Sequence, residues 1–162
     1  MFLAYSSPFL PGETLRPEKW SDDVLESWGA LIGQIHRLTQ NYPVFDGVIN
    51  PATGEKTLNW HDEMNSFLNW CADEEVKAVW RSFQNRVAAL PVTRQMCGMV
   101  QNDPHMENLL IYENKLRLID FDVSSCHFFA SDIAIAIQSV LFTRSGGMER
   151  PLSDKDALLH FV

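Results

Sequence analysis

Residues 101–122 read QNDPHMENLLIYENKLRLIDFD, and two short strand-like runs in this stretch flank the dipeptide Glu113-Asn114. Short runs separated by a two-residue turn are typical of a β-hairpin. Lys115 and Arg117 alternate with apolar residues in the second run, which indicates that one face of the hairpin meets water. We therefore predict a hairpin formed by residues 109–112 and 115–119.

Acidic and amide side chains gather at the open end of this predicted hairpin. Asp103 and Asn108 come before the first strand, and Asp120 and Asp122 follow the second. The tight turn places Asn108 beside Asp120, with Asp103 on the adjoining loop. Two like charges about 4 Å apart repel by about 4 kcal/mol at an effective dielectric constant near 20. A divalent cation would offset this repulsion, and carboxylate and amide oxygens suit Mg²⁺.

Two other interpretations of these residues stay open. Asp103 and Asn108 are common turn formers, and Asp120 suits the end of a strand. The second interpretation is a metal-dependent hydrolase whose ligands are Asp103, His105, Asp120 and Asp122. Such enzymes usually have more ligands at tighter spacing. The ordered set favours the magnesium site over either alternative.

The rest of the chain is mainly helical by its apolar spacing. Ser21 is a good N-cap for a helix that reaches about Thr39, and a shorter helix is expected from about Trp60 to Trp70. A third helix carries an apolar stripe from Val76 and stops at Pro91. Aromatic side chains on these helices suit ligand stacking, but stripes at this spacing are usually core, which is our expectation. Asp132 precedes an apolar helix, and a last helix begins near residue 153. The predicted class is α+β, mainly helical.

Composition limits the range of functions. The chain has 162 residues, enough for one domain, and a net charge of −8, which argues against a nucleic-acid partner. No apolar stretch approaches the roughly 20 residues that span a bilayer. The N-terminus lacks a basic signal-peptide region, and Cys71, Cys97 and Cys126 form no C-x-x-C pair. We expect a cytoplasmic protein without membrane or nucleic-acid partners.

The ordered motifs resemble those of the aminoglycoside phosphotransferase/choline kinase family of kinase-like enzymes. The family signature H-G-D-x-H-x-x-N matches residues 101–108, I-D-F matches residues 119–121, and D-[IL]-A matches residues 132–134. Residues 28–38 look like its L-G-x-x-L-x-x-L-H-x-L helix. The likeness covers roughly residues 1–145. It implies the C-terminal lobe of a protein-kinase-like fold with a small catalytic-loop β-hairpin.

The resemblance also implies roles for individual residues. Asp103 would be the catalytic base, and Asn108 and Asp120 would hold Mg²⁺ and through it ATP, with Asp122 as a candidate third ligand. Structural support would come from Gln101, His105 and Asp132. His105 would either line the phosphate-acceptor side of the site or be a loop histidine whose hydrogen bonds are satisfied, and the two roles fit equally well. His36 is expected to be a packing histidine. Gln101 replaces the His of the signature, so we expect weaker bracing of the loop.

The domain assignment follows from the same resemblance. Residues 1–17 resemble a remnant of the interlobe linker, and residues 18–162 a kinase-like C-lobe that is truncated at both ends. The 162 residues contain no Gly-rich strand-turn-strand and lysine of the kind that grips ATP in this family. The leading interpretation is an ATP- and Mg²⁺-dependent phosphotransferase acting on a small-molecule hydroxyl or amine. The alternative is a catalytically inactive kinase-like lobe that acts as a binding or remnant module.

Expected partners are a small-molecule acceptor of unknown identity and either the missing N-lobe or a second copy bound through the exposed lobe face. In this family the acceptor pocket is built by the helices after the first helix and by the missing C-terminal part of the lobe. Candidates to line it are Trp60, Asp62, Glu63 and Trp70, although surface and core roles are favoured for them.

Overall fold

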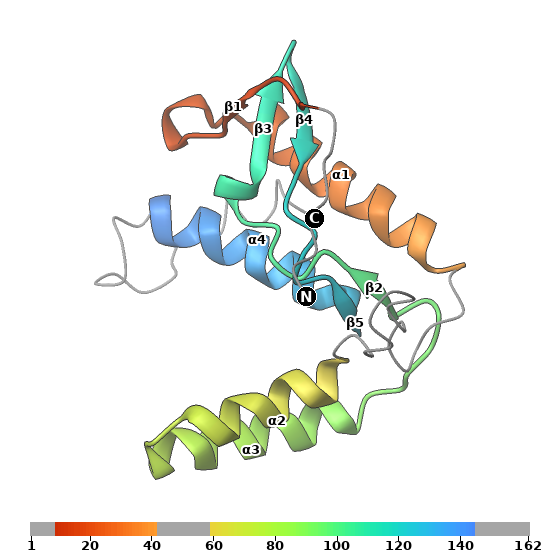
Figure 1. Cartoon of the computed structure of the whole chain (residues 1–162), viewed down its shortest axis with the longest axis vertical. Helices are drawn as coiled ribbons and strands as arrows, with labels where there is room; N and C mark the ends of the chain where they lie inside the picture. Colours follow the sequence, from red (N-terminus) through yellow and green to blue (C-terminus); the bar gives the residue numbers. More distant parts are fainter. Residues whose placement is uncertain (1–8, 42–58, 145–162) are drawn as a thin grey trace, which may run out of the picture.

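The computed structural model describes residues 9–41 and 59–144. The sequence predicts a loop at residues 43–58, from its Asn50-Pro51 and Thr53-Gly54 pairs, and this loop lies outside these ranges. So do residues 1–8 and the whole helix expected to begin near residue 153. The described part is an α+β structure (Figure 1) with the following elements: β1 (Glu13–Thr14), η1 (Pro17–Lys19), α1 (Asp22–Thr39), α2 (Trp60–Trp70), α3 (Glu74–Ala88), β2 (Cys97–Val100), η2 (Met106–Asn108), β3 (Leu109–Tyr112), β4 (Lys115–Leu118), β5 (Ser125–Phe128) and α4 (Phe129–Arg144).

The first helix forms as its sequence predicts. The Oγ atom of Ser21 accepts a hydrogen bond from the Val24 amide at 3.3 Å, and acidic residues occupy the first turn, where the helix dipole favours them. The buried side chains recur every three or four residues along one face. These are Leu25, Trp28, Ile32 and His36.

The predicted hairpin is confirmed. Strands β3 and β4 are antiparallel, with Leu109 opposite Leu118 and Tyr112 opposite Lys115. Glu113 and Asn114 both have positive φ, 49° and 57°, as a two-residue turn of the hairpin type requires. Strand β1 pairs with β3 on its other side, so a short stretch near the N-terminus completes a three-stranded sheet.

A second, two-stranded sheet joins β2 to β5, with Cys97 opposite Phe128. Strand β5 was not predicted. Helix α4 follows it directly and begins at Phe129, so Asp132 lies in its first turn and not ahead of it. That difference arises because the Asp132 carboxylate is turned inward and binds the loop after β2, instead of capping its own helix.

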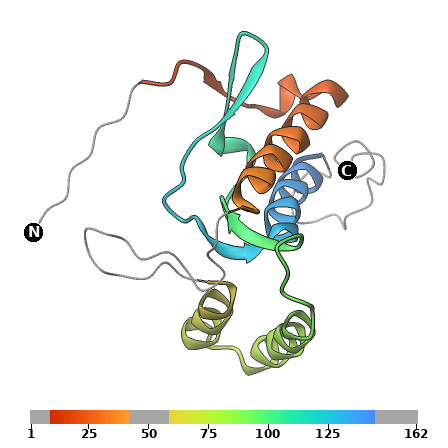
Figure 2. The ribbon, with the colours of Figure 1, turned by 90° about the vertical axis from the view of Figure 1, so that its right-hand side faces the viewer.

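Helices α1 and α4 pack side by side beneath the hairpin (Figure 2) and form the main core. A smaller cluster of Trp60, Met64, Cys97 and Phe128 attaches α2 to the two-stranded sheet. The core role expected for the stripe on α3 is confirmed only in part: Trp80 and Val87 pack against this cluster, whereas Val79 and Phe83 remain exposed. Helix α3 packs mainly on α2, and these two helices form an arm at one end of the molecule (Figure 1). Within the described ranges, no helix is long and apolar enough to span a bilayer.

Candidate active site

The loop between β2 and η2 carries Asp103, and the end of η2 carries Asn108. The Asn108 side chain is buried, and its Nδ2 atom donates to the Asp103 carbonyl at 2.9 Å and to Asp103 Oδ2 at 3.1 Å. An amide that binds both the backbone and the carboxylate fixes the orientation of the acid. The structure therefore brings these two residues together as the motif spacing predicts.

Asp120 reaches the same place from the end of β4. The Ile119 amide donates to the Asn108 carbonyl at 2.9 Å, which carries the pairing of the hairpin one step past β4. Asp120 then turns away with a positive φ of 60°. A hydrogen bond with the Asp122 side chain and the like charge of Asp122 raise the pKa of Asp120, and the charge of Asp103 adds to this. The charges of Asp122 and Asp103 thus both act on the Asp120 carboxyl.

These residues fit a divalent cation that takes few protein ligands. Asn108 uses its nitrogen on Asp103, which leaves Oδ1 for a cation, and Asp120 is exposed. No lysine or arginine in the described ranges forms an ion pair with Asp103, Asp120 or Asp122. Those ranges also contain no cluster of three or more His, Cys, Asp or Glu that could enclose a metal. Mg²⁺, which keeps several waters and shares phosphate oxygens, suits this arrangement better than the multi-ligand hydrolase alternative.

Gln101 ties the loop that carries Asp103 to the end of the hairpin. It is 1% exposed, and its Oε1 atom accepts from the Asp103 amide at 2.8 Å. Its Nε2 atom donates to the Ile119 carbonyl at 3.2 Å and to the Asp120 carbonyl. Gln101 therefore does brace the loop, because one amide supplies both the acceptor and the donors that the loop needs.

Asp132 supports the loop from the other side. Its Oδ1 atom accepts from the Asn102 amide at 2.8 Å and its Oδ2 atom from the Gln101 amide at 3.2 Å. The Nε2 atom of His36 lies 2.8 Å from Oδ2, and the His36 ring stacks on Phe129 with centroids 4.4 Å apart. The packing role predicted for His36 is confirmed by its burial and stacking, but its contact with Asp132 is not predictable from the local sequence. The polarity of His36 on the buried face of an amphipathic helix was the available signal, since buried polar groups need partners.

His105 forms a hydrogen bond within the loop and contacts the Asp103 carboxylate. Its Nδ1 atom accepts from the Glu107 amide at 3.1 Å, so the neutral ring carries its proton on Nε2. That atom lies 3.2 Å from Asp103 Oδ2. An open hollow of about 420 Å³ lies beside the pair, bordered by Ile135, Gln138 and Ser139 of α4. His105 is thus both a satisfied loop histidine and a neighbour of the acid that faces this hollow.

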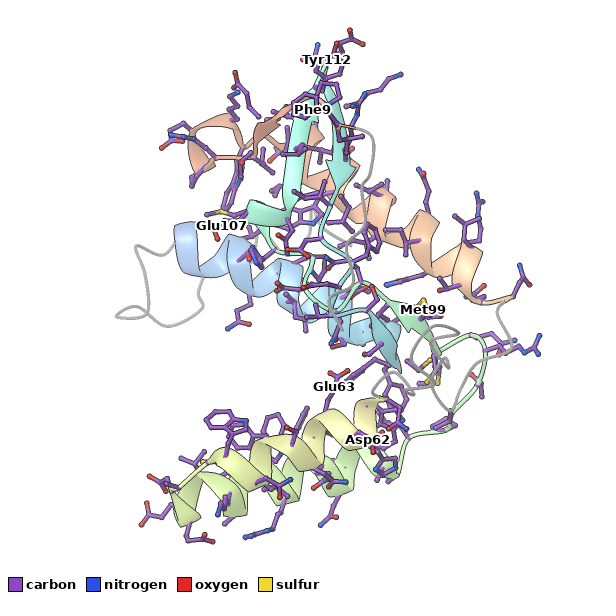
Figure 3. All side chains as sticks on the ribbon, in the orientation of Figure 1. Phe9, Asp62, Glu63, Met99, Glu107 and Tyr112 are labelled. Atoms are coloured by element: carbon purple, nitrogen blue, oxygen red, sulfur yellow. The ribbon has the colours of Figure 1, made fainter. Side chains whose placement is uncertain are left out.

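A larger groove of about 940 Å³ lies between the α2–α3 arm and the β5–α4 segment. Of the four residues expected to line an acceptor pocket, Glu63 and Trp70 border this groove; Trp60 is buried in the core and Asp62 is exposed elsewhere. Figure 3 shows Glu63 projecting from α2 toward the main body. Its Oε2 atom accepts from Asn102 Nδ2 at 3.0 Å, so the groove reaches the residue next to Asp103.

Comparisons with known proteins agree with this fold. The chain matches the phosphotransferase enzyme family over residues 2–157. Amicoumacin kinase of Bacillus subtilis (strain 168) is 27% identical over 135 residues, which cover 82% of this chain and 38% of that protein. The solved structure of amicoumacin kinase hAmiN in complex with AMP-PNP, Ca²⁺ and Ami superposes with a TM-score of 0.73 at 22% identity, covering 94% of this chain and 45% of that one.

Two further solved structures share the fold at lower similarity. A microcompartment-associated aminopropanol kinase has a TM-score of 0.54 at 16% identity and covers 94% of this chain and 54% of its own. A choline/ethanolamine kinase family protein from Mesorhizobium loti has a TM-score of 0.51 at 15% identity, with 92% and 53% covered.

The fold and the loop geometry are those of a kinase-like phosphotransferase. The chain belongs to the phosphotransferase enzyme family. It spans about two fifths of the length of the Bacillus kinase and about half the length of these solved relatives.

Proposed function

We propose that this chain carries the catalytic loop of an ATP- and Mg²⁺-dependent phosphotransferase that acts on a hydroxyl or amine of a small molecule. The observation that carries the proposal is the convergence of Asp103, Asn108 and Asp120 at one end of the hairpin. A cytoplasmic location, where ATP is available, is part of the proposal.

In the proposed reaction the acceptor oxygen or nitrogen attacks the γ-phosphorus of ATP. A bond forms between the acceptor atom and phosphorus, the bond from phosphorus to the β–γ bridging oxygen breaks, and ADP leaves with that electron pair. Asp103 accepts the acceptor proton, and the Asn108 amide and His105 Nε2 hold its carboxylate in place. Asn108 Oδ1 and Asp120 would hold magnesium, which would neutralise phosphate charge.

The relatives support the nucleotide and the cation. One of the structures with the same fold is a kinase in complex with AMP-PNP and Ca²⁺, and the Bacillus relative is named a kinase. Because this chain spans less than two thirds of either protein, their activities remain proposals here.

The test is transfer of phosphate from γ-labelled ATP to a panel of amino alcohols and hydroxyl compounds, measured with the chain and its variants. Asp103→Asn should lower transfer at least 100-fold, within the range of about 10² to 10⁴ for loss of a general base. Asp62→Asn is the matched control, because Asp62 is an exposed acid outside the groove. Wild-type transfer by the Asp103→Asn variant would contradict the role of Asp103.

Calorimetry with Mg²⁺ and ATP distinguishes the alternative of a non-catalytic kinase-like lobe. Micromolar binding that Asp120→Asn weakens supports the phosphotransferase. A chain that neither binds the nucleotide nor transfers phosphate supports the non-catalytic module.

A further inference from the structure

Asn102 directly precedes Asp103 and has a backbone conformation that few side chains adopt. Its φ is 70°, in the left-handed region. Asn tolerates this region better than most residues, and glycine adopts it without steric cost. The turn before Asp103 would thus form with glycine, so the contacts of the Asn102 side chain call for a reason of their own.

The side-chain amide of Asn102 joins two segments that are distant in the chain. Its Nδ2 atom donates to Glu63 Oε2 on α2 at 3.0 Å and, over a longer distance of 3.4 Å, to the carbonyl of Val123. Both partners are oxygens that only accept hydrogen bonds, so their chemistry decides which atom of the amide faces them. The two N–H bonds of one side chain therefore connect α2 to the segment after β4.

Glu63 is a well-fixed anchor for this amide. Its neighbours on α2, Trp60 and Met64, are buried in the smaller core cluster, so the first turn of the helix cannot shift without disturbing close-packed side chains. Glu63 projects from this turn toward the main body (Figure 3). A carboxylate also accepts a stronger hydrogen bond than a neutral oxygen does.

The second partner of the amide lies close to the candidate cation ligands. Val123 comes three residues after Asp120, whose carbonyl accepts from Gln101 Nε2. Gln101 and Asn102 thus hold this short segment at both of its ends. Because Asp103 is the next residue of the loop, these bonds set the separation between its carboxylate and the segment that carries Asp120.

We propose that Asn102 is a positioning residue for phosphoryl transfer and that Glu63 is its anchor. Asp132 of α4 holds the backbone amide of Asn102, and Glu63 of α2 holds its side chain, so the loop is fixed from both helices. Asn102 contacts no reacting atom and acts through the orientation of Asp103. This inference rests on the proposed function and assigns it two further residues.

Asn102→Gly removes the amide and keeps the backbone conformation. In transfer of phosphate from γ-labelled ATP by the full chain, we expect kcat to fall by about tenfold to 100-fold, because a catalytic group displaced by about 1 Å costs up to about 10²-fold. KM for ATP should change by less than about twofold, since the loss concerns orientation and not binding.

Asn114→Gly is the matched control for this variant. Asn114 also has a positive φ, 57°, but lies exposed in the hairpin turn. Removal of its amide therefore has the same effect on the freedom of the unfolded backbone and leaves the loop of Asp103 alone. This variant should keep the wild-type kcat.

An exchange of donor and acceptor tests the pair. In Asn102→Asp a second carboxylate faces Glu63, and the two charges repel, so kcat should fall further than in Asn102→Gly. In the double variant Glu63→Gln/Asn102→Asp the donor and the acceptor change places. We expect it to recover kcat at least about tenfold relative to Asn102→Asp, a coupling that two unrelated sites would not show.

Hydrogen exchange of backbone amides provides a readout that needs no activity. The amides of Asp103 and Ser124 form hydrogen bonds on either side of the contact, to Gln101 Oε1 and to the Phe121 carbonyl. Asn102→Gly should accelerate exchange at both about tenfold, while the core amides of α4 exchange as in the wild type. Equal acceleration throughout α4 would indicate a general loss of stability and contradict a local positioning role.

The proposal is overturned by wild-type kcat and exchange in Asn102→Gly, or by a double variant that recovers nothing. Its failure is separable from that of the proposed function. Wild-type transfer that Asn102→Gly leaves unchanged would keep the reaction and reject the positioning role. A wild-type chain that transfers no phosphate would reject the reaction, and local acceleration of exchange, or its absence, would still decide whether Asn102 orders the loop of Asp103.

Discussion

The Nε2 atom of His36 lies 2.8 Å from Oδ2 of Asp132, although 96 positions separate the two residues in the chain. Both side chains are buried, and the same carboxylate accepts the amides of Gln101 and Asn102. Helix α1, helix α4 and the loop that carries Asp103 are therefore joined through one acid. The position of Asp103 depends on contacts that come from both helices.

Asp132→Asn tests this connection. The substitution keeps the shape but replaces one acceptor oxygen with a donor that faces His36 or a backbone amide. We expect the free energy of unfolding to fall by about 2–3 kcal/mol, as for other broken buried networks. Urea denaturation measures it, and Glu26→Gln on the exposed face of α1 should change it by less than about 0.5 kcal/mol. Equal stability of the two variants would contradict the network.

Gln101→Glu tests the brace between the loop and the hairpin. A carboxylate cannot donate to the Ile119 and Asp120 carbonyls, and at a site that is 1% exposed it would face those oxygens without water. We expect a loss of about 2–3 kcal/mol of folding stability. Gln34→Glu, an exposed change on α1, is the control in the same urea titration. No greater loss for Gln101→Glu than for this control would show that the brace is unimportant.

The half-buried imidazole of His127 predicts a stability that depends on pH. Burial lowers its pKa in the folded state, so the unfolded chain binds the proton more readily. The contribution of the neutral ring is complete above the unfolded pKa of about 6.5 and is lost as pH falls through the lower folded value.

The measurement compares the free energy of unfolding at neutral pH and below pH 6. The wild type should lose more stability on acidification than His127→Gln does. The control is His61→Gln, which removes an exposed histidine of α2 and should keep the wild-type loss. A wild-type loss in His127→Gln would exclude His127 as the cause.

The hairpin and the meeting of its ends were predictable because they depend on local signals. A two-residue turn between alternating runs sets the register, and the register places Asn108 beside the exit of β4. The capped helix α1 was predictable for the same reason, since Ser21 and the apolar spacing lie within one segment.

The rest depends on contacts between distant segments. Strand β5 exists because it pairs with β2. Its residues 125–128, Ser-Cys-His-Phe, alternate polar and apolar side chains over only four positions and include none of the β-branched residues typical of strands. The stripe on α3 predicted a helix correctly, but periodicity does not say whether protein covers it, and here Val79 and Phe83 remain exposed. The hydrogen bonds of His36 and Gln101 likewise require knowledge of which segments meet.

The measurement that addresses the shared cation site most directly is Mn²⁺ titration of the ¹⁵N-labelled chain, because bound Mn²⁺ broadens nearby amide signals. We predict that the amides of Asn108 and of residues 120–122 broaden first, that Mg²⁺ reverses the effect, and that Asp120→Asn abolishes it while Asp23→Asn on α1 does not. Broadening that begins elsewhere, or that persists unchanged in Asp120→Asn, would contradict a cation site formed by Asn108 and Asp120 beside Asp103.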